Sequence, residues 1–297
     1  MQLILAFWIT EFNFRRGGFL EMFNCGLEFD CLLKVGSYNI FMNIVRYYPF
    51  AGLLFALFYM WKKSSFFRYK IQEKYPNTDK IKKEIVQSLV TLIVFSGIAT
   101  TVYILNKLHV IHTKMYRDPE LYGGVSYMIL SFILITIWHE TWFYWAHRIM
   151  HHKKIYSYVH AVHHQSVNPT PIAAYNFHWV EAIFEGIYVV PFLLVFPMYY
   201  PVFLIHTFYA MFLNMYFHSG FEFYPKGFTT HPIFRWINTS THHNLHHSKF
   251  NGNYSLYFNF WDRLMGTNFK QYEESFEKVL SRKDSFGVQK VLTSSNL

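Results

Sequence analysis

Histidines gather in three short clusters in the second half of the chain, where their spacing could build a metal site. The clusters run from His147 to His151, from His160 to His164 and from His243 to His247. Spacings of three and four residues place side chains on one face of a helix. Neutral imidazole binds zinc, copper, iron or nickel. Each cluster can therefore offer ligands to a common ion.

Eight clustered histidines exceed what one ion usually takes, so we expect two metal ions with about four protein ligands each. The predicted ligands are His147, His151, His160, His163, His164, His243, His246 and His247. His178 and His218 are additional candidates, as ligands or as groups that orient ligands. Packing could explain any one of these residues, but it gives no reason for three such clusters, and adjacent rings would repel if charged. We expect no catalytic side chain beyond the metal ligands.

Three carboxylates could accept the second ring N–H that metal-bound histidines normally donate. They are Glu140, Glu181 and Asp262. The alternatives remain open, because Glu181 could be an ordinary surface carboxylate and Asp262 could form an ion pair with the adjacent Arg263.

The composition predicts a membrane protein. Hydrophobic residues make up 52% of the chain and charged residues 15%, which is unusual for a soluble domain. Long apolar runs recur at 47–61, 86–105, 125–146 and 182–217, and a helix needs about 20 apolar residues to cross the hydrocarbon core. The last run is interrupted by prolines, which predicts a hairpin that enters the membrane and returns. Cys25 and Cys31 lie far from the histidines, and we expect free thiols.

The formal charge of +9 is interpreted as membrane topology, and we expect no nucleic-acid partner. Eight lysines and arginines fall within 62–83, between the first two apolar runs. Under the positive-inside rule this loop is cytoplasmic. Two further crossings return the chain to the same side, so the histidines are predicted to lie on the cytoplasmic face of a multi-pass protein. Its membrane would be the bacterial inner membrane or the endoplasmic reticulum.

We therefore predict an all-α membrane bundle with about four membrane-embedded helices or hairpins and a cytosolic, histidine-rich, metal-binding cap. Four regions are expected in the chain. An N-terminal extension of unknown role covers 1–40, a transmembrane region covers 41–124, a catalytic domain covers 125–272, and a polar C-terminal tail covers 273–297. The tail is expected to be a solvated helix or disordered.

Two metal-dependent functions fit the pattern poorly. A zinc hydrolase would carry His-Glu-x-x-His, and His139-Glu140 begins this motif, but Phe143 breaks it. An ion transporter would place polar groups inside its spans, whereas these histidines follow the spans. A histidine site beside the bilayer favours oxidation of a lipid, and unactivated C–H bonds require a redox-active metal with O2.

Three segments resemble the fatty acid hydroxylase / sterol desaturase superfamily. They are ETWFYWAHRIMH at 140–151, HAVHHQSVNPTPIAAYNFH at 160–178 and TSTHHNLHHSKFNGNYSLYFNFWDRLMGT at 239–267. The Asn-Pro-Thr-Pro stretch, Phe-His178 and the Trp-Asp-Arg-Leu-Met-Gly ending look most like the sterol desaturase branch.

The resemblance implies a non-haem di-iron oxygenase that hydroxylates or desaturates a sterol or fatty acyl lipid. Its two iron ions would be held by the eight clustered histidines, with His178 and His218 also at family histidine positions. The chain lacks the His-Pro-Gly-Gly haem-binding segment of fused family members. A separate electron donor is therefore expected, a b-type cytochrome or a ferredoxin with its reductase. The alternative is a non-catalytic membrane protein with a structural zinc site, although such a site needs only four ligands.

Overall fold

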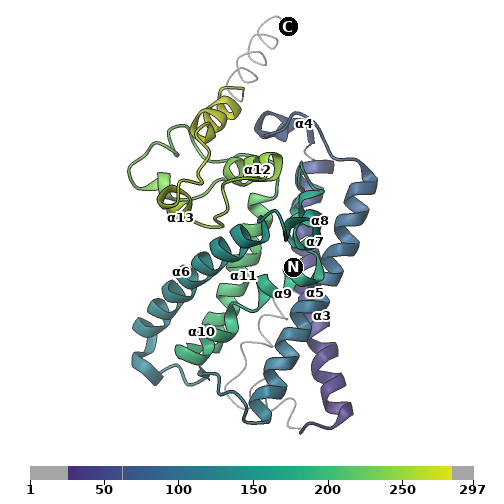
Figure 1. Ribbon diagram of the computed structural model, residues 1–297, viewed down its shortest axis with the longest axis vertical. Helices are drawn as coiled ribbons and strands as arrows, with labels where there is room; N and C mark the ends of the chain where they lie inside the picture. The colour runs from purple at the N-terminus through teal and green to yellow at the C-terminus, as the bar shows by residue number, and fades with distance from the viewer. Residues whose placement is uncertain (1–25, 62, 283–297) are drawn as a thin grey trace, which may run out of the picture.

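A computed structural model describes residues 26–61 and 63–282, which fold into a helical bundle topped by a cap of short helices (Figure 1). Within these residues, three helices are long and apolar enough to cross a membrane: Phe29–Trp61, Thr78–Lys107 and Leu121–Met150. The prediction of an all-α membrane bundle is confirmed. Strands are confined, in the described ranges, to a short parallel pair of β1 (Met115–Tyr116) and β2 (Met198–Tyr199).

The first long helix starts earlier than the apolar pattern suggests. Helix α3 (Phe29–Phe55) continues into the π-helical segment η1 (Ala56–Trp61), so residues 29–40 of the expected N-terminal extension belong to it. Asp30 and Lys34 dilute the apolar signal there, while Val35 packs against Tyr103 of α5. Cys31 is disulfide-bonded, so the expectation of a free thiol is wrong for this residue, and Cys25 lies outside the described part. Residues 1–25 lie outside the described part.

Capping and turn residues mark the start of the next two long helices. Helix α5 (Thr78–Lys107) starts after Asn77, whose side chain accepts a hydrogen bond from the Lys80 N–H at 2.9 Å. Helix α6 (Gly124–Met150) follows the 3-10 turn η3 (Leu121–Gly123), and Gly123 and Gly124 both adopt positive φ there. This α6 helix ends in the first histidine cluster.

The last apolar run forms the predicted hairpin. Helices α9 (Trp179–Gly186) and α10 (Val189–Val195) run away from the cap, and α11 (Tyr200–Phe217) returns to it (Figure 1). At the turn, β2 pairs with β1, which lies in the connection between α5 and α6. The turn therefore lies at the end of the bundle opposite the histidines, and His178 and His218 both lie near the cap.

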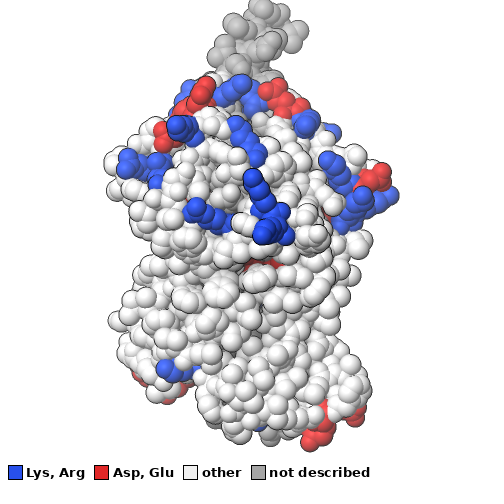
Figure 2. Space-filling view, in the orientation of Figure 1, with Lys and Arg blue, Asp and Glu red and all other residues white. Residues whose placement is uncertain are grey.

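Short segments build the cap. They are α4 (Lys63–Phe66), η2 (Phe67–Tyr69), α7 (Tyr156–Val159), α8 (Ala161–His164), η5 (Phe234–Trp236), α12 (Ser240–Lys249) and α13 (Phe260–Leu264). The short segment η4 (Pro171–Tyr175) instead packs between α3, α5 and α11. Lysines and arginines gather over the cap, above a broad band with few charges (Figure 2).

The C-terminal region is only partly as expected. Residues 272–282 form a helix whose Phe276 and Leu280 are buried against Phe228 of the cap. The start of the expected tail is therefore a packed amphipathic helix, and residues 283–297 lie outside the described part.

Polar side chains of α5 anchor the segment that follows the second histidine cluster. The Thr91 hydroxyl donates to the Tyr175 carbonyl at 2.7 Å, and the Ser88 hydroxyl donates to the Ile172 carbonyl at 3.0 Å. The Glu84 carboxylate accepts hydrogen bonds from Ser166 at 2.8 Å and Thr170 at 2.6 Å. Buried backbone without such partners would cost stability, so these contacts fix η4 between the long helices and the histidines.

Candidate metal centre

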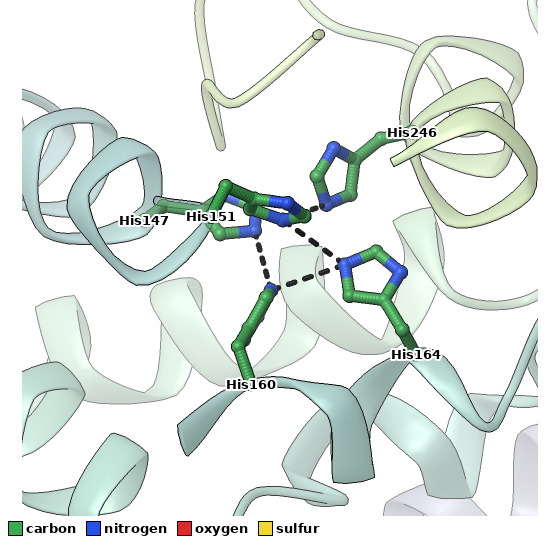
Figure 3. A group of neighbouring side chains, drawn as sticks. All are labelled: His147, His151, His160, His164 and His246. Carbon is green, nitrogen blue, oxygen red and sulfur yellow. Dashed lines mark hydrogen bonds between the residues drawn. The ribbon is translucent and has the colours of Figure 1, made fainter. Parts of the chain in front are cut away.

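Nine histidines converge in two groups, in each of which the candidate ligand atoms lie within 4.8 Å of one another. The first group contains His147, His151, His160, His164 and His246 (Figure 3). The second group contains His163, His218, His243 and His247. We call them group 1 and group 2. All eight clustered histidines predicted as ligands belong to one group or the other.

The histidines of one helix are divided between the groups. On α12, His246 faces group 1, while His243 and His247 face group 2. On α8, His163 joins group 2 and its neighbour His164 joins group 1. Consecutive residues of a helix point about 100° apart. Histidines that are adjacent in the sequence therefore face different groups. The expectation that each cluster lies on one face of a helix and serves a common ion did not include this division.

In group 1 the Nε2 atoms form a continuous series of close approaches (Figure 3). The His160 Nε2 lies 3.0 Å from that of His147 and 3.1 Å from that of His164. The His151 Nε2 lies 3.1 Å from that of His164 and 3.2 Å from that of His246. Nitrogens bound to one ion at about 2.0–2.1 Å would lie about 3 Å apart, as these atoms do.

In group 2, His218 occupies the middle. Its Nε2 lies 3.0 Å from that of His243, 3.1 Å from that of His247 and 3.3 Å from that of His163. His218 is the residue that directly follows α11, so the returning arm of the hairpin places it under the cap. The sequence offered it only as an additional candidate, because no second histidine stands at ligand spacing from it.

The other ring nitrogen of four histidines has a fixed acceptor. The Nδ1–H of His147 donates to the Tyr254 carbonyl, and that of His246 donates to the Gly252 carbonyl, both at 2.7 Å. That of His218 donates to the Asn214 carbonyl at 2.8 Å. The His160 Nδ1 lies 2.7 Å from Oε1 of Glu181. A carbonyl can only accept, so Nδ1 carries the proton in the first three rings and, when the ring is neutral, Nε2 is left bare.

These rings are held in the neutral form. Burial lowers the pKa well below the ordinary value for His160, His163, His164, His243, His246 and His247. Burial also lowers the pKa of His218 to about 3. Its single bare lone pair on Nε2 cannot serve three neighbouring Nε2 atoms as a hydrogen-bond acceptor. A cation among these four Nε2 atoms would bind the lone pair of each of them, so the donor set fits a metal ion.

The three carboxylates act in two ways. Glu181 contacts His160 directly, which is one of the two roles that the sequence left open. Glu140 instead accepts the N–H groups of residues 256, 257 and 258 at 3.1, 2.5 and 3.2 Å. Asp262 accepts the N–H groups of Tyr254 and Ser255, both at 2.9 Å. Glu140 and Asp262 therefore fix the loop 252–258, whose carbonyls orient His147 and His246. Sequence reasoning missed this loop, because backbone acceptors leave no signal in residue type.

His178 belongs to neither group. It caps the N-terminus of α9, where its Nδ1 accepts from the Val180 N–H at 3.4 Å. His139, two turns before His147, is buried and hydrogen-bonded to the Tyr257 hydroxyl at 2.9 Å. His242, beside the third cluster, lies 3.6 Å from Asp262 and faces the Tyr272 ring.

Comparisons with known proteins agree with this geometry. Residues 132–267 match the fatty acid hydroxylase family model. The chain is 34% identical over 170 residues to lathosterol oxidase of Rattus norvegicus, covering 56% of this chain and 54% of that protein. It is 32% identical over 157 residues to a Delta(7)-sterol 5(6)-desaturase of Gibberella zeae, covering 53% of this chain and 47% of the relative.

A putative methylsterol monooxygenase of Dictyostelium discoideum is also 32% identical over 157 residues, covering 52% of this chain and 57% of that protein. The chain thus spans about half the length of these relatives. No solved structure matches. The matched segment contains all nine histidines of the two groups. Residues 132–267 of this chain therefore form a domain of the fatty acid hydroxylase / sterol desaturase superfamily.

Proposed function

We propose that this protein is a membrane-bound non-haem di-iron oxygenase that hydroxylates or desaturates a sterol or fatty acyl lipid. The observation that carries the proposal is the convergence of nine imidazoles in two groups beside an apolar bundle. Group 1 would hold one iron ion and group 2 the other. When bound, the two ions would supply the O2-dependent oxidation that no side chain can perform on an unactivated C–H bond.

The chain's own residues prepare the site for that chemistry. Four Nδ1 acceptors fix the orientation of His147, His160, His218 and His246, which leaves their Nε2 atoms directed at the centre. Eight of the nine rings are buried and His151 is partly buried, so the protein excludes most water from the centre. Water exclusion strengthens electrostatic interactions and limits side reactions.

The names of the relatives favour a sterol-type substrate. The relatives include a sterol desaturase, a lathosterol oxidase and a methylsterol monooxygenase. An apolar substrate dissolved in the bilayer would reach the cap from the membrane, next to the end of α6. We place the catalytic domain at 125–272, with a packed helix following it to residue 282. The preceding transmembrane region starts at Phe29 instead of residue 41 and extends to 124, and we assign no role to the residues before it.

We further propose that the metal centre faces the cytoplasm of a multi-pass protein in a bacterial inner membrane or the endoplasmic reticulum. Lysines and arginines gather at the histidine end (Figure 2). The disulfide-bonded Cys31 lies at the start of α3 beside Tyr103, near the end of α5 and away from the histidines. Disulfides persist in oxidising compartments. Electrons would come from a separate b-type cytochrome or a ferredoxin with its reductase.

The test is a metal and product analysis of the full-length protein. We expect two iron ions per chain and O2-dependent conversion of an added sterol when a reductant and an electron donor are supplied. Hydroxylation would add one oxygen and desaturation would remove two hydrogens. His163→Ala should abolish turnover, whereas His231→Ala, at an exposed position outside both groups, should not. Tightly bound zinc with no O2 consumption would instead identify a structural metal protein.

A further inference from the structure

Six large apolar side chains lie exposed where the segment around η5 meets α13 in the cap. They belong to the segment around η5 and to α13, and each is between 37 and 69% exposed: Ile233, Phe234, Trp236, Phe260, Leu264 and Met265. We call them the apolar cap face. Contiguous exposed apolar surface of this kind marks an interaction site.

The two segments form one surface. The Asn259 N–H donates to the Trp236 carbonyl at 3.0 Å, and the Asn259 side chain donates to the Arg235 carbonyl at 2.9 Å. An isolated antiparallel bridge joins Ile237 to Phe258. Because η5 and α13 are tied together by these backbone contacts, their exposed side chains are neighbours although 24 or more residues separate many of them along the chain.

This surface adjoins the outward face of α6. The Trp261 indole of α13 donates to the Thr141 hydroxyl at 3.2 Å, and its ring lies 5.8 Å from that of Trp145. An exposed apolar stripe runs along α6 in steps of four residues, through Ile129, Ile133 and Ile137 and, past the half-buried Thr141, through Trp145 and Ile149. On a membrane-spanning helix, such a stripe faces lipid. Figure 1 places α13 above the histidine end of α6.

Charge at the edge of the surface fits a headgroup layer. The guanidinium groups of Arg235 and Arg263 lie 4.9 and 5.7 Å from the Trp236 ring centre. Arginine can lay its stem along apolar surface while its head stays with water or phosphate. Tryptophan is enriched at the same depth. Apolar side chains flanked by arginine and tryptophan are typical of segments that lie in a membrane interface.

We propose that the apolar cap face is seated in the bilayer leaflet in which the histidine end of α6 emerges. The apolar cap face contacts the boundary between lipid headgroups and acyl chains, and it is not covered by a second protein. The continuity with the α6 stripe supports this choice, because the same lipid would cover both surfaces. The cap is then tethered beside the membrane from two sides, by the long helices and by α13. This inference stands apart from the oxygenase proposal, since it needs only that α6 spans the membrane.

Photo-crosslinking in a bilayer tests it. The photoreactive residue p-benzoylphenylalanine replaces Leu264 in the full-length protein, reconstituted in nanodiscs of phosphatidylcholine and phosphatidylglycerol. The same residue at Ile133, in the α6 stripe, is the control for lipid exposure. Ser248, exposed on α12, is the control for a water-facing cap position. After irradiation, intact-mass spectrometry measures whether a phospholipid has been added.

We expect a mass increase of one phospholipid at positions 264 and 133, and none at 248. A lipid adduct at 133 but none at 264 would overturn the proposal while leaving the membrane span intact. A crosslink from 264 to a second protein chain would also overturn it, since the surface would then be a protein interface. Equal lipid labelling at 264 and 248 would show that the label does not distinguish the apolar cap face, which also contradicts the proposal.

Discussion

The carboxylate of Glu181 lies 2.7 Å from Nδ1 of His160, and both side chains are buried. Glu181 stands in the first turn of α9 and His160 directly precedes α8, so the contact ties the membrane hairpin to the second histidine cluster. A carboxylate on Nδ1 orients the ring and raises the basicity of Nε2. The position of the hairpin therefore determines whether Glu181 reaches His160, and so how strongly His160 would bind the proposed metal ion.

Glu181→Leu should weaken metal binding in group 1. Loss of a hydrogen-bonded partner of a ligand histidine typically costs about 10- to 100-fold in metal affinity. The measurement is a competition titration with a chelator of known affinity. Glu185→Leu, one turn further along α9 and also buried, is the matched control and should keep its affinity. Equal losses in both variants would mean that the effect is general damage to α9.

His218→Ala should remove the ion of group 2. Its Nε2 approaches all three other members of that group, so the remaining histidines would lose the central ligand. We expect the iron content to fall by about half and turnover to disappear. Elemental analysis of the purified variant measures the first effect. His178→Ala is the comparison, since His178 lies in neither group, and it should retain two ions. Full iron content in His218→Ala would exclude it as a ligand.

Glu140→Leu should destabilise the protein whether or not metal is bound. The substitution leaves two buried backbone N–H groups and one partly buried N–H group without their acceptor, at about 1–3 kcal/mol for each buried group that finds no other partner. Thermal unfolding in detergent, recorded with and without metal, measures the effect. Glu181→Leu should lower Tm chiefly in the metal-loaded protein. The prediction fails if Glu140→Leu unfolds at the wild-type temperature in both forms.

The metal-free protein should lose stability as the pH falls below about 6.5, the pKa of histidine in an unfolded chain. Burial lowers the folded-state pKa of the cap histidines, and of His218 to about 3. The unfolded chain therefore binds more protons than the folded one below pH 6.5, so stability rises with pH up to that value. Tm measured in chelator between pH 5 and 8 should rise and then level off. A double variant, His243→Gln with His247→Gln, should show a shallower slope.

Much of the site could be predicted from the sequence, because its ligands are a rare residue type at helical spacing. The eight clustered histidines follow from that pattern, whereas Glu181 was equally compatible with an ordinary surface carboxylate. The central position of His218 could not, since only the folded hairpin brings residue 218 under the cap. Nor could the roles of Tyr254 and Gly252, whose contribution is a backbone carbonyl. The early start of α3 was hidden because Asp30 and Lys34 interrupt its apolar pattern.

Helices α8 and α12 each direct adjacent histidines to different groups, so binding of one of the two proposed ions would affect binding of the other. Any rotation of α12 that improves the fit of His246 to one ion also moves His247 at the other. The first ion to bind would immobilise the shared helices, so the second ion would bind at a lower cost in conformational entropy. A calorimetric titration of metal-free protein should then show positive cooperativity. Two independent, equal binding steps would contradict this expectation.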